Sequence, residues 1–476
     1  MAERPFVYRF TKDLRLDDHA GLAAAAARGA VIPLLVICSS TSARLRRSPR
    51  RAAYFCAAVA ALDAELRERG SALVVRRGEP ADAIVSVARA AQASGVAWSA
   101  GYDGAAIERD RALQMQLEEQ GLAALIVHDA PAVPPDETAA ARSGSGVGYR
   151  AFAPYFDAWC AAPVASYEYP LLLRFAATTT SSQALPSPGE FDARECDVAA
   201  GAVAARRTLE RFLREDAPHY AAAATDPAND RTSHLSAHLS FGTISGRAVA
   251  RAAAVRLNDP FAIGEERLSV RLFLRAFAHR DFFFQLAWFH PETGAQALQE
   301  KMRDFQWAQT HPALEAWREG ATGYPLVDAG VRQLRATGWM HPHVRAVAAS
   351  FLCFDLGVDW RIGVDEWDRW LIEDDEALAC GNWQWIAGVG ADMAQYPRIY
   401  NPERQRRRYD PAGAYVRRWI GELAHVPLDR WYGRPSQSRQ LALALEPAPA
   451  YAKPVVDHGL AARNFLRRYR QHASKA

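Results

Sequence analysis

TGWMHPHVRAVAASFLCFDLGVDWRIGVDEWDRWLIEDDEALACGNWQWIAGVGADMAQYPRIYNP, residues 337–402, is the stretch around which the chain is organised. It places six tryptophans among aliphatic residues, together with Arg345 and the acidic run Glu373–Glu376. Aromatic residues at helical spacing are most often core packing, so the composition is compatible with a tryptophan-rich helical core. The added charges fit a second interpretation, a pocket that holds a flat aromatic ligand with polar edges.

Length and composition narrow the class of protein. A chain of 476 residues is too long for one hydrophobic core, and half of its residues are hydrophobic, so we expect a folded protein of two domains. The net charge of +3 permits nucleic-acid binding through a local basic patch but does not indicate it. Six cysteines lie far apart, without metal-ligand spacing. The N-terminus lacks a secretory apolar run, and no apolar stretch reaches about 18 residues, so we expect a cytoplasmic protein without a membrane segment.

The first quarter of the chain alternates short β-rich apolar runs with amphipathic helical patterns. Parallel strands need long connections, which helices supply, so this pattern predicts a parallel sheet with crossover helices. No GxGxxG follows the first run, which argues against a dinucleotide site of that type. The runs are Phe6–Phe10, Val31–Ile37, Leu73–Val75, Val96–Trp98 and Leu125–Val127.

The remainder of the chain divides by composition. Residues 131–203 are rich in Pro, Ser, Thr, Gly and Ala, which is typical of an interdomain linker. From residue 204 the apolar residues recur at helical spacing, which predicts an all-helical second domain. We therefore expect an α/β domain over 1–130, a linker over 131–203 and a helical domain over 204–476.

Several short words occur in a fixed order along the chain. Their order and spacing resemble the photolyase/cryptochrome family of FAD proteins over essentially the whole sequence. The resemblance implies an α/β domain that carries an antenna pigment, followed by an all-α FAD-binding domain. The words are RFTKDLRLDDHAGL (9–22), RTSHLSAHLSFGTIS (231–245), TGYPLVDAGVRQL (322–334), TGWMH (337–341), ASFL followed by DW (349–360), GNWQW (381–385), YPRIYNP (396–402) and YAKPVVDH (451–458).

The resemblance assigns FAD-binding residues. On spacing alone, the hydroxyl residues around 232–236 are equally an ordinary helix cap. Arg280 falls at the family's pyrophosphate arginine, a role that suits a permanently charged bidentate donor. Arg345 and Glu373 fall at the family's Arg–Asp pair against the flavin ring, and Asp375 at its second acid. The residues that match contacts with the FAD phosphates and ribityl chain are Tyr220, Thr232, Ser233, Leu235 and Ser236.

The resemblance also implies an electron relay. Trp307, Trp360 and Trp383 match the three tryptophans that pass an electron from the surface to the photoexcited flavin. Ala379 aligns with the residue that faces flavin N5, which is Asn in typical photolyases, and alanine offers N5 no hydrogen bond. Trp385 matches a tryptophan of the lesion pocket.

Other positions depart from the family's repair pockets. Cyclobutane-dimer photolyases carry Glu and Trp at the positions of Ala276 and His279, and (6-4) photolyases carry histidines at those of Pro342 and Ala346. A folate antenna is held in many relatives by an Asn-Glu pair, which aligns here with Ala105 and Ala106. The second chromophore is therefore another pigment, or none.

Three functions remain open on the sequence. The first is light-driven electron transfer from reduced FAD to a pyrimidine lesion in DNA, the second a cryptochrome-like photoreceptor, and the third a flavin redox enzyme with a reused pocket. DNA would be a partner of the first, and we expect a monomer. A basic run supplies the candidate DNA contacts, although such runs are usually solvated faces. Its members are Arg404, Arg406, Arg407 and Arg408.

Overall fold

The computed structural model describes residues 4–140, 148–167, 173–176, 181–392, 397–431 and 451–474. Its contacts divide the chain into two compact units. The first comprises residues 1–221, 233–294 and 372–378, and the second comprises 222–232, 295–371 and 379–476. The expected domain boundaries near 130 and 203 both fall inside the first unit, so this division does not coincide with them.

A five-stranded parallel sheet with the order β3-β2-β1-β4-β5 forms the centre of the first unit. The predicted strands are confirmed, with shifts of one or two residues at the ends of β3, β4 and β5. β2 is buried along its whole length, as a strand covered on both faces should be. The strands are β1 Phe6–Phe10, β2 Val31–Ile37, β3 Val74–Arg77, β4 Gly95–Ser99 and β5 Ala123–Val127.

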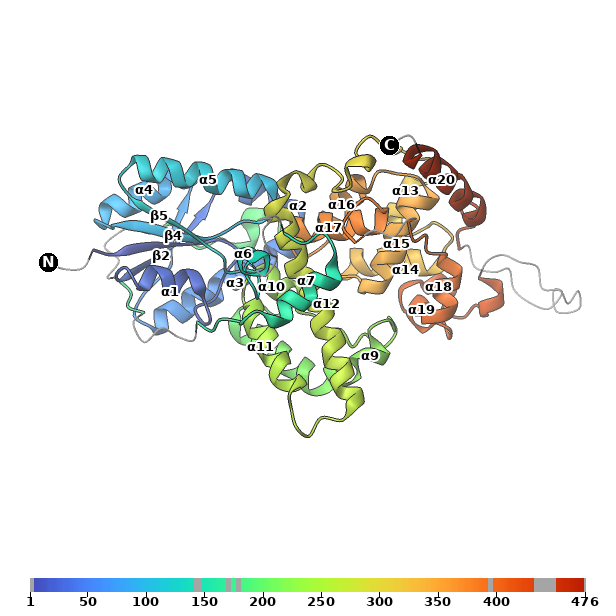
Figure 1. Cartoon of the computed structure of the whole chain (residues 1–476), viewed down its shortest axis with the longest axis horizontal. Helices are drawn as coiled ribbons and strands as arrows, with labels where there is room; N and C mark the ends of the chain where they lie inside the picture. Colours follow the sequence, from blue (N-terminus) through green and yellow to red (C-terminus); the bar gives the residue numbers. More distant parts are fainter. Residues whose placement is uncertain are drawn as a thin grey trace, which may run out of the picture. The chain divides into compact units, whose positions relative to one another are not determined.

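Helices cover both faces of this sheet (Figure 1). α1 (Ala20–Ala26) and α3 (Pro49–Glu68) pack on one face, where Leu22 and Val59 are fully buried. α4 (Pro80–Ala90) and α5 (Gly104–Glu119) pack on the other. The crossover helices expected from the sequence are thus present, and they form one layer on each face of the sheet.

The rest of the first unit is helical. Its longest helix, α12, spans Gly264–Phe289, and within the described residues no helix is both long and apolar enough to cross a bilayer. Asp281 on α12 accepts hydrogen bonds from the Trp159 indole (2.9 Å) and the Ala132 amide (2.8 Å), which fixes the expected linker to this helix. The other elements are α2 Ser39–Arg47, α6 Pro135–Ala140, α7 Phe152–Ala161, η1 Pro188–Phe191, α8 Ala202–Arg211, η2 Phe212–Asp216, η3 Ala217–His219, α10 Ser236–Ser240, α11 Gly246–Leu257 and η4 Pro291–Gly294.

The second unit is helical in its described parts and has one large aromatic core. α14 packs against α15, α18 and α19, and Gly338, with φ of 74°, ends α14 in the left-handed conformation that glycine favours. α9 (Tyr220–Ala223) and α17 (Glu376–Ala387) each have residues in both units. The other elements are η5 Glu300–Met302, α13 Leu314–Glu319, α14 Pro325–Thr337, α15 Pro342–Ser350, η6 Phe351–Asp355, α16 Trp360–Asp368, α18 Pro402–Tyr409, α19 Ala414–Trp419, η7 Gly421–Leu423, η8 Leu428–Arg430 and α20 His458–Ala473.

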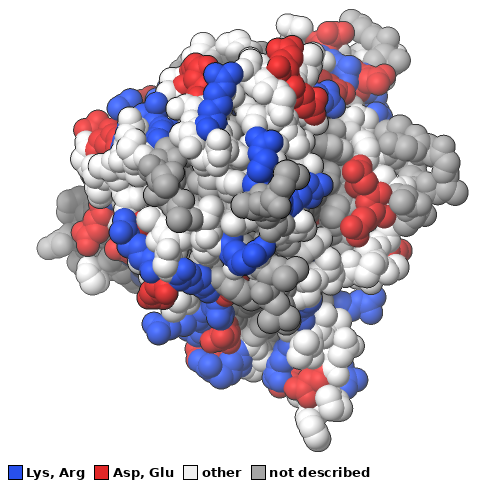
Figure 2. All heavy atoms as spheres, turned by 90° about the vertical axis from the view of Figure 1, so that its left-hand side faces the viewer, with Lys and Arg blue, Asp and Glu red and all other residues white. Residues whose placement is uncertain are grey.

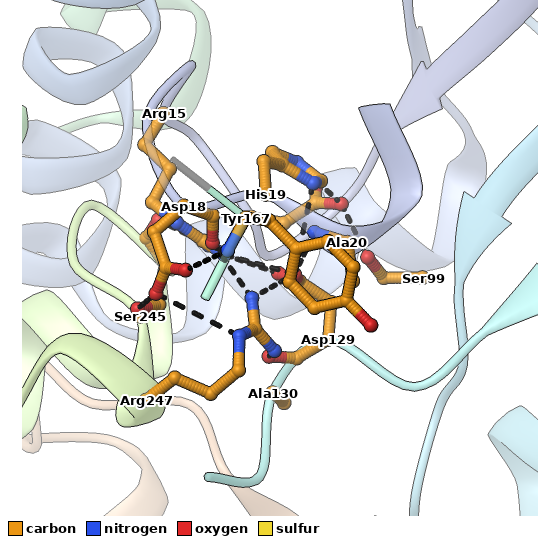
Figure 3. A network of polar contacts seen from close by, with 12 residues as sticks. Arg15, Asp18, His19, Ala20, Ser99, Asp129, Ala130, Tyr167, Ser245 and Arg247 are labelled. Carbon is orange, nitrogen blue, oxygen red and sulfur yellow. Dashed lines mark hydrogen bonds and ion pairs between the residues drawn. The ribbon is translucent and has the colours of Figure 1, made fainter. Parts of the chain in front are cut away.

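A buried polar network ties the loop after β1 to α11 in the first unit (Figure 3). Asp129 accepts hydrogen bonds from Arg15 (2.7 Å) and Arg247 (2.7 Å). Asp18 lies 3.6 Å from Arg247 and accepts a hydrogen bond from the Ser245 hydroxyl. Burial alone would raise the pKa of Asp129, but the charges of Arg15 and Arg247 hold it well below its ordinary value. The network therefore contributes to the fold as paired charges.

The same network includes the spacing of a metal site. One ligand-type atom from each of Asp13, His19 and Asp129 lies within 4.8 Å of the others. However, two guanidinium groups already neutralise Asp129, and a cation placed beside them would meet like charge. We therefore infer that these three residues stabilise the fold and do not bind a metal ion.

Candidate functional site

A cavity of 1430 Å³ opens at the carboxyl ends of the strands in the first unit. Its walls include Phe10–Asp13 after β1, Cys38 after β2 and Ser99–Asp103 after β4. The strand order reverses between β1 and β4, which is the point where open α/β sheets bind ligands. The volume exceeds that of a typical small-molecule pocket. Ala105 and Ala106 lie on its wall, at the positions where folate-binding relatives carry Asn and Glu.

Arg280 reaches this cavity from α12. Its guanidinium donates to the carbonyl oxygens of Ala130 (2.7 Å) and Leu239 (3.4 Å) and lies over the Phe284 ring at 4.6 Å. Its Nε is buried and has no hydrogen-bond partner among the residues that the structure describes. A buried, cavity-lining donor of this kind fits the phosphate groups of a dinucleotide such as FAD.

The expected phosphate segment is distributed over both units. Tyr220, Ser233, Leu235 and Ser236 belong to the first unit, and Thr232 to the second. The helix α10 begins at Ser236, so Thr232 and Ser233 lie three to four residues before its start, and the chain turns between them and the helix, where His234 has φ of 51°. The Ser236 hydroxyl is 3.4 Å from Glu373 Oε2, which brings two of the predicted cofactor residues together.

The acidic run contributes a residue that sequence reasoning missed. Asp374 bonds to Arg44, lies 3.1 Å from Lys12 Nζ and lies 3.6 Å from the fully buried Arg51. Burial raises the pKa of Asp374, but these three cations outweigh it and hold the pKa well below its ordinary value. Arg44 and Arg51, which had no predicted role in the site, therefore hold the segment that carries Glu373 and Asp375.

Asp375 also lines the cavity, and burial raises the pKa of this carboxyl group. It thus differs from Asp374, although the two residues are adjacent. Both residues line the cavity, but cations outweigh burial at Asp374, and burial outweighs the charges of Lys12 and Arg280 at Asp375.

Asp374→Asn is expected to lower the stability of the protein by about 2–3 kcal/mol at neutral pH. Loss of one partner from a fully buried ion pair costs about 3–5 kcal/mol, and the partial exposure of Lys12 and Arg44 reduces this figure. A carboxylate with a depressed pKa stabilises the fold above its unfolded pKa of about 4, and this contribution is lost as the pH falls through its lower folded pKa. The difference between wild type and variant in urea denaturation should therefore shrink below about pH 4.

Asp17→Asn is the matched control for this variant. Asp17 pairs with Arg206 at 2.6 Å, but both side chains are about half exposed, so the expected change is near zero. Equal denaturation midpoints for Asp374→Asn and wild type at pH 7 would contradict the role given to Asp374.

The predicted relay tryptophans belong to one aromatic core in the second unit. Trp360 and Trp383 are buried in this core, and Trp307 and Trp385 pack against it partly buried. Trp307 lies toward the surface, with its ring 4.9 Å from Phe305. This gradient of burial is the one that a path from the surface to an interior acceptor requires.

Trp383 is positioned by α16, through residues that sequence reasoning did not assign. A Cβ at Gly363 would overlap the Trp383 indole, so the ring lies directly against the helix backbone there. Gly363 is one turn from both Trp360 and Trp367, and the Trp367 ring is 4.5 Å from that of Trp383. Trp367 in turn stacks on Trp317 at 6.1 Å. The sequence WRIGVDEW, residues 360–367, places a glycine between two tryptophans on one helical face. This spacing could have indicated that another ring packs against α16.

Other predicted residues of the second unit flank this core. Arg345 is partly buried on α15, and its Nε donates to the Met340 carbonyl oxygen at 2.8 Å. Ala379 is partly buried on α17, one turn before Trp383. The pairing of Arg345 with Glu373 stays a prediction, because these residues belong to different units. The facing of Ala379 toward flavin N5 also stays a prediction.

The positions that depart from the repair pockets have defined surroundings. Ala276 is exposed on α12. His279 stacks on the Phe152 ring, with centroids 3.4 Å apart, and its Nδ1 is 2.9 Å from the Arg275 carbonyl oxygen. Its ring is thus held against the linker helix α7 by stacking.

The corresponding positions of the second unit lie on α15. Pro342 is exposed at its first turn and Ala346 is partly buried. His343 is held by Gln405 (3.2 Å) and by the Tyr409 ring (4.0 Å), both on α18. Burial lowers the pKa of the neighbouring His341 to about 4, so this ring is neutral at pH 7.

The arginine run on α18 separates into two groups. Arg404, Arg407 and Arg408 are exposed, as a nucleic-acid contact requires. Arg406 is buried, donates to the Asp410 carbonyl oxygen at 3.1 Å and lies over Trp431 at 5.6 Å. The structure therefore gives Arg406 a packing role instead of the expected surface position, because its place on α18 faces the core.

Comparison with known proteins gives the family. The family described as the FAD binding domain of DNA photolyase matches residues 273–471, and the family described as DNA photolyase matches residues 6–171. A deoxyribodipyrimidine photo-lyase from Halobacterium salinarum is 35% identical, over 94% of this chain and 95% of the relative. The chain belongs to the photolyase/cryptochrome family. Cryptochrome-1 of Arabidopsis thaliana is also similar, at 31% identity over 94% of this chain and 67% of its own.

Solved structures of photolyases share the fold. A bacterial class III photolyase from Agrobacterium tumefaciens superposes with a TM-score of 0.86 at 29% identity, covering 100% of this chain and 98% of its own. An archaeal photolyase from Sulfolobus tokodaii, described with two FAD molecules, gives 0.82 at 27% identity, covering 98% and 100%. The predicted fold class, a parallel-sheet α/β domain with a helical FAD-binding domain, is confirmed.

Proposed function

We propose that this photolyase-family protein uses blue light to transfer an electron from reduced FAD to a pyrimidine lesion in DNA. The observation that carries the proposal is the shared aromatic core of Trp307, Trp360 and Trp383 in a chain with a FAD-binding domain. Such a core offers electron transfer between the surface and a buried cofactor. Its cofactor, rather than a protein side chain, would supply the redox chemistry.

The residues of this chain would bind and tune that cofactor. Arg280 would neutralise the pyrophosphate with a charge that it cannot lose by deprotonation. Tyr220, Thr232, Ser233, Leu235 and Ser236 would line the phosphates and ribityl chain. Arg345 with Glu373 and Asp375 would set the charge beside the flavin ring, and Ala379 would leave N5 without a side-chain hydrogen bond.

We further propose that the part of the first unit's cavity at the carboxyl ends of the strands, away from Arg280 and Asp375, holds a second, planar chromophore other than folate. Its place at the reversal of strand order supports this proposal, and the volume of 1430 Å³ covers both this part and the part that Arg280 and Asp375 line. Ala105 and Ala106 offer no polar group to a folate. The Sulfolobus tokodaii photolyase, whose second FAD is described as a novel light-harvesting cofactor, is a precedent for a flavin.

DNA would approach the exposed arginines Arg404, Arg407 and Arg408, whose charges suit phosphate contacts. The alternative, a cryptochrome-like photoreceptor without repair activity, is favoured by Ala276 and His279. These residues remove the carboxylate and the indole that the family's dimer repair uses. The flavin redox enzyme is the least supported of the three functions.

The test is light-driven repair by the reduced, FAD-loaded protein. Duplexes that carry one cyclobutane dimer or one (6-4) product are illuminated with blue light, and restored pyrimidines are measured by chromatography. We expect repair of one lesion in the light and none in the dark. Ala276→Glu combined with His279→Trp restores the family's dimer contacts and should increase dimer repair. Intact lesions in all samples, despite full light-driven reduction of the flavin, would support the photoreceptor instead.

A further inference from the structure

The helix α20 (His458–Ala473) lies at the outer edge of the second unit (Figure 1). Its side chains pack on the segment that carries Phe305 and Trp307. It attaches through two buried side chains one turn apart, Phe465 (3% exposed) and Tyr469 (4% exposed). The Phe465 ring is 5.6 Å from Trp307 and 4.8 Å from Phe354. The rings of α20 thus pack on Phe305, Trp307 and Phe354.

Polar contacts fix the helix along the same segment. His472 Nε2 lies 2.8 Å from the Lys301 carbonyl oxygen. Arg468 donates to the carbonyl oxygen of Gln306 and lies over the Phe305 ring at 5.5 Å. The Arg468 charge is thus held at the residue that precedes Trp307, and the Trp307 side chain remains partly exposed.

The charge of α20 has one sign. Its sequence, HGLAARNFLRRYRQHA, contains four arginines and no acidic residue. Arg463, Arg467 and Arg470 are exposed, and at about 100° per residue they lie on the side opposite Phe465. The segment 300–304 is balanced, with Lys301 and Arg303 against Glu300 and Asp304. Two further acids lie at the start of α20, where Asp457 caps the helix and Asp355 pairs with His458, so they offset only part of the charge of the four arginines. The helix therefore gives the surroundings of Trp307 a local excess of positive charge.

We infer that the surface around Trp307 is a docking site for a small anionic one-electron donor. The inference rests on the relay of the proposed function, in which Trp307 is the outer member. An α-helix is about 10–12 Å across, which is more than the Debye length of about 8 Å at physiological salt but much less than the roughly 30 Å at 0.01 M. The outward arginines and the adjacent Arg468 thus attract an anion toward Trp307 at low ionic strength and are screened at high ionic strength.

The electron balance at this site is simple. One electron leaves the anionic donor and fills the vacancy left on the Trp307 indole after it has passed an electron inward. The indole returns to its neutral state, the donor is oxidised by one electron, and no bond is formed or broken.

The primary test compares two donors and two variants of the FAD-loaded protein. Ferrocyanide is anionic, and hydroquinone is uncharged at pH 7. In the Arg463→Glu/Arg467→Glu/Arg470→Glu variant, the second-order rate constant of light-driven reduction with ferrocyanide should fall about tenfold or more at low salt. The matched Gln variant, which retains helix propensity, should give an intermediate value. Rates with hydroquinone should stay within about twofold of wild type.

A second measurement does not depend on photoreduction. The fluorescence of Trp307 is obtained as the difference between wild type and Trp307→Phe, and its quenching by iodide and by uncharged acrylamide is compared. The Glu variant should lose iodide quenching and retain acrylamide quenching. Retained acrylamide quenching and an unchanged circular dichroism spectrum also show that α20 remains folded and in place.

The outcomes separate the inference from the proposed function. Equal responses of both donors and both quenchers to the charge changes overturn the inference, even if Trp307 is required for photoreduction. If Trp307→Phe photoreduces at the wild-type rate, Trp307 is not part of the relay, and the donor site is also refuted.

Discussion

Trp383→Phe is expected to slow light-driven reduction of the bound flavin by more than about tenfold while FAD remains bound. Phenylalanine fills most of the same space, but its ring is much harder to oxidise than indole. Each 1.4 kcal/mol added to an activation barrier slows a step about tenfold. A tenfold loss of rate therefore needs only a small part of the difference in oxidation free energy between phenylalanine and indole. The measurement is the rate at which flavin absorbance bleaches under blue light with an external reductant.

Trp317→Phe is the control for this experiment. Trp317 is fully buried, lies 6.5 Å from Trp383 and belongs to the same core, but it has no place in the predicted relay. This variant should photoreduce at close to the wild-type rate. A wild-type rate in Trp383→Phe, or an equal loss in both variants, would refute the relay assignment.

Arg280→Ala is expected to weaken FAD binding by roughly 10–100-fold. Hydrogen bonds to charged groups contribute about 1.5–3 kcal/mol, and Arg280 presents a buried cavity-lining guanidinium whose Nε has no hydrogen-bond partner within the described part of the chain. Arg280→Lys should lie between wild type and Ala, because it keeps the charge and loses the bidentate geometry. The dissociation constant is measured by titration of the flavin-free protein with FAD.

Arg275→Ala provides the matched control on the same helix. Arg275 is exposed and lies over the Phe152 ring at 4.9 Å, so its loss should leave FAD affinity unchanged. If Arg280→Ala binds FAD as tightly as wild type, the assignment of Arg280 to the cofactor site is wrong.

The sequence predicted the sheet well, because parallel strands buried on both faces form continuous apolar runs. β1 and β2 have the predicted limits. The ends of β3 to β5 differ by one or two residues: β3 begins one residue later than predicted, and hydrogen bonding carries β3, β4 and β5 past the large apolar residues of each run. Polar or small residues such as Arg77, Gly95 and Ser99 therefore belong to strands that composition alone would end earlier.

The site was less predictable where it depends on contacts between distant segments. Arg44 and Asp374 are 330 positions apart, and each alone is an ordinary surface charge. Burial of Arg406 also follows from tertiary packing, since an arginine run gives no sign of which member faces Trp431. Local patterns were informative where geometry is local, as with the tryptophan–glycine–tryptophan spacing on α16.

The most direct test of the account is the behaviour of the wild-type protein with FAD under blue light. The protein is reconstituted with FAD, freed of unbound cofactor and illuminated with an external reductant while the visible spectrum is recorded. The account predicts a yellow protein with non-covalently bound FAD, whose flavin absorbance bleaches in the light and recovers on exposure to air. A well-folded protein that stays colourless after reconstitution, or a bound flavin that does not respond to light, would contradict it.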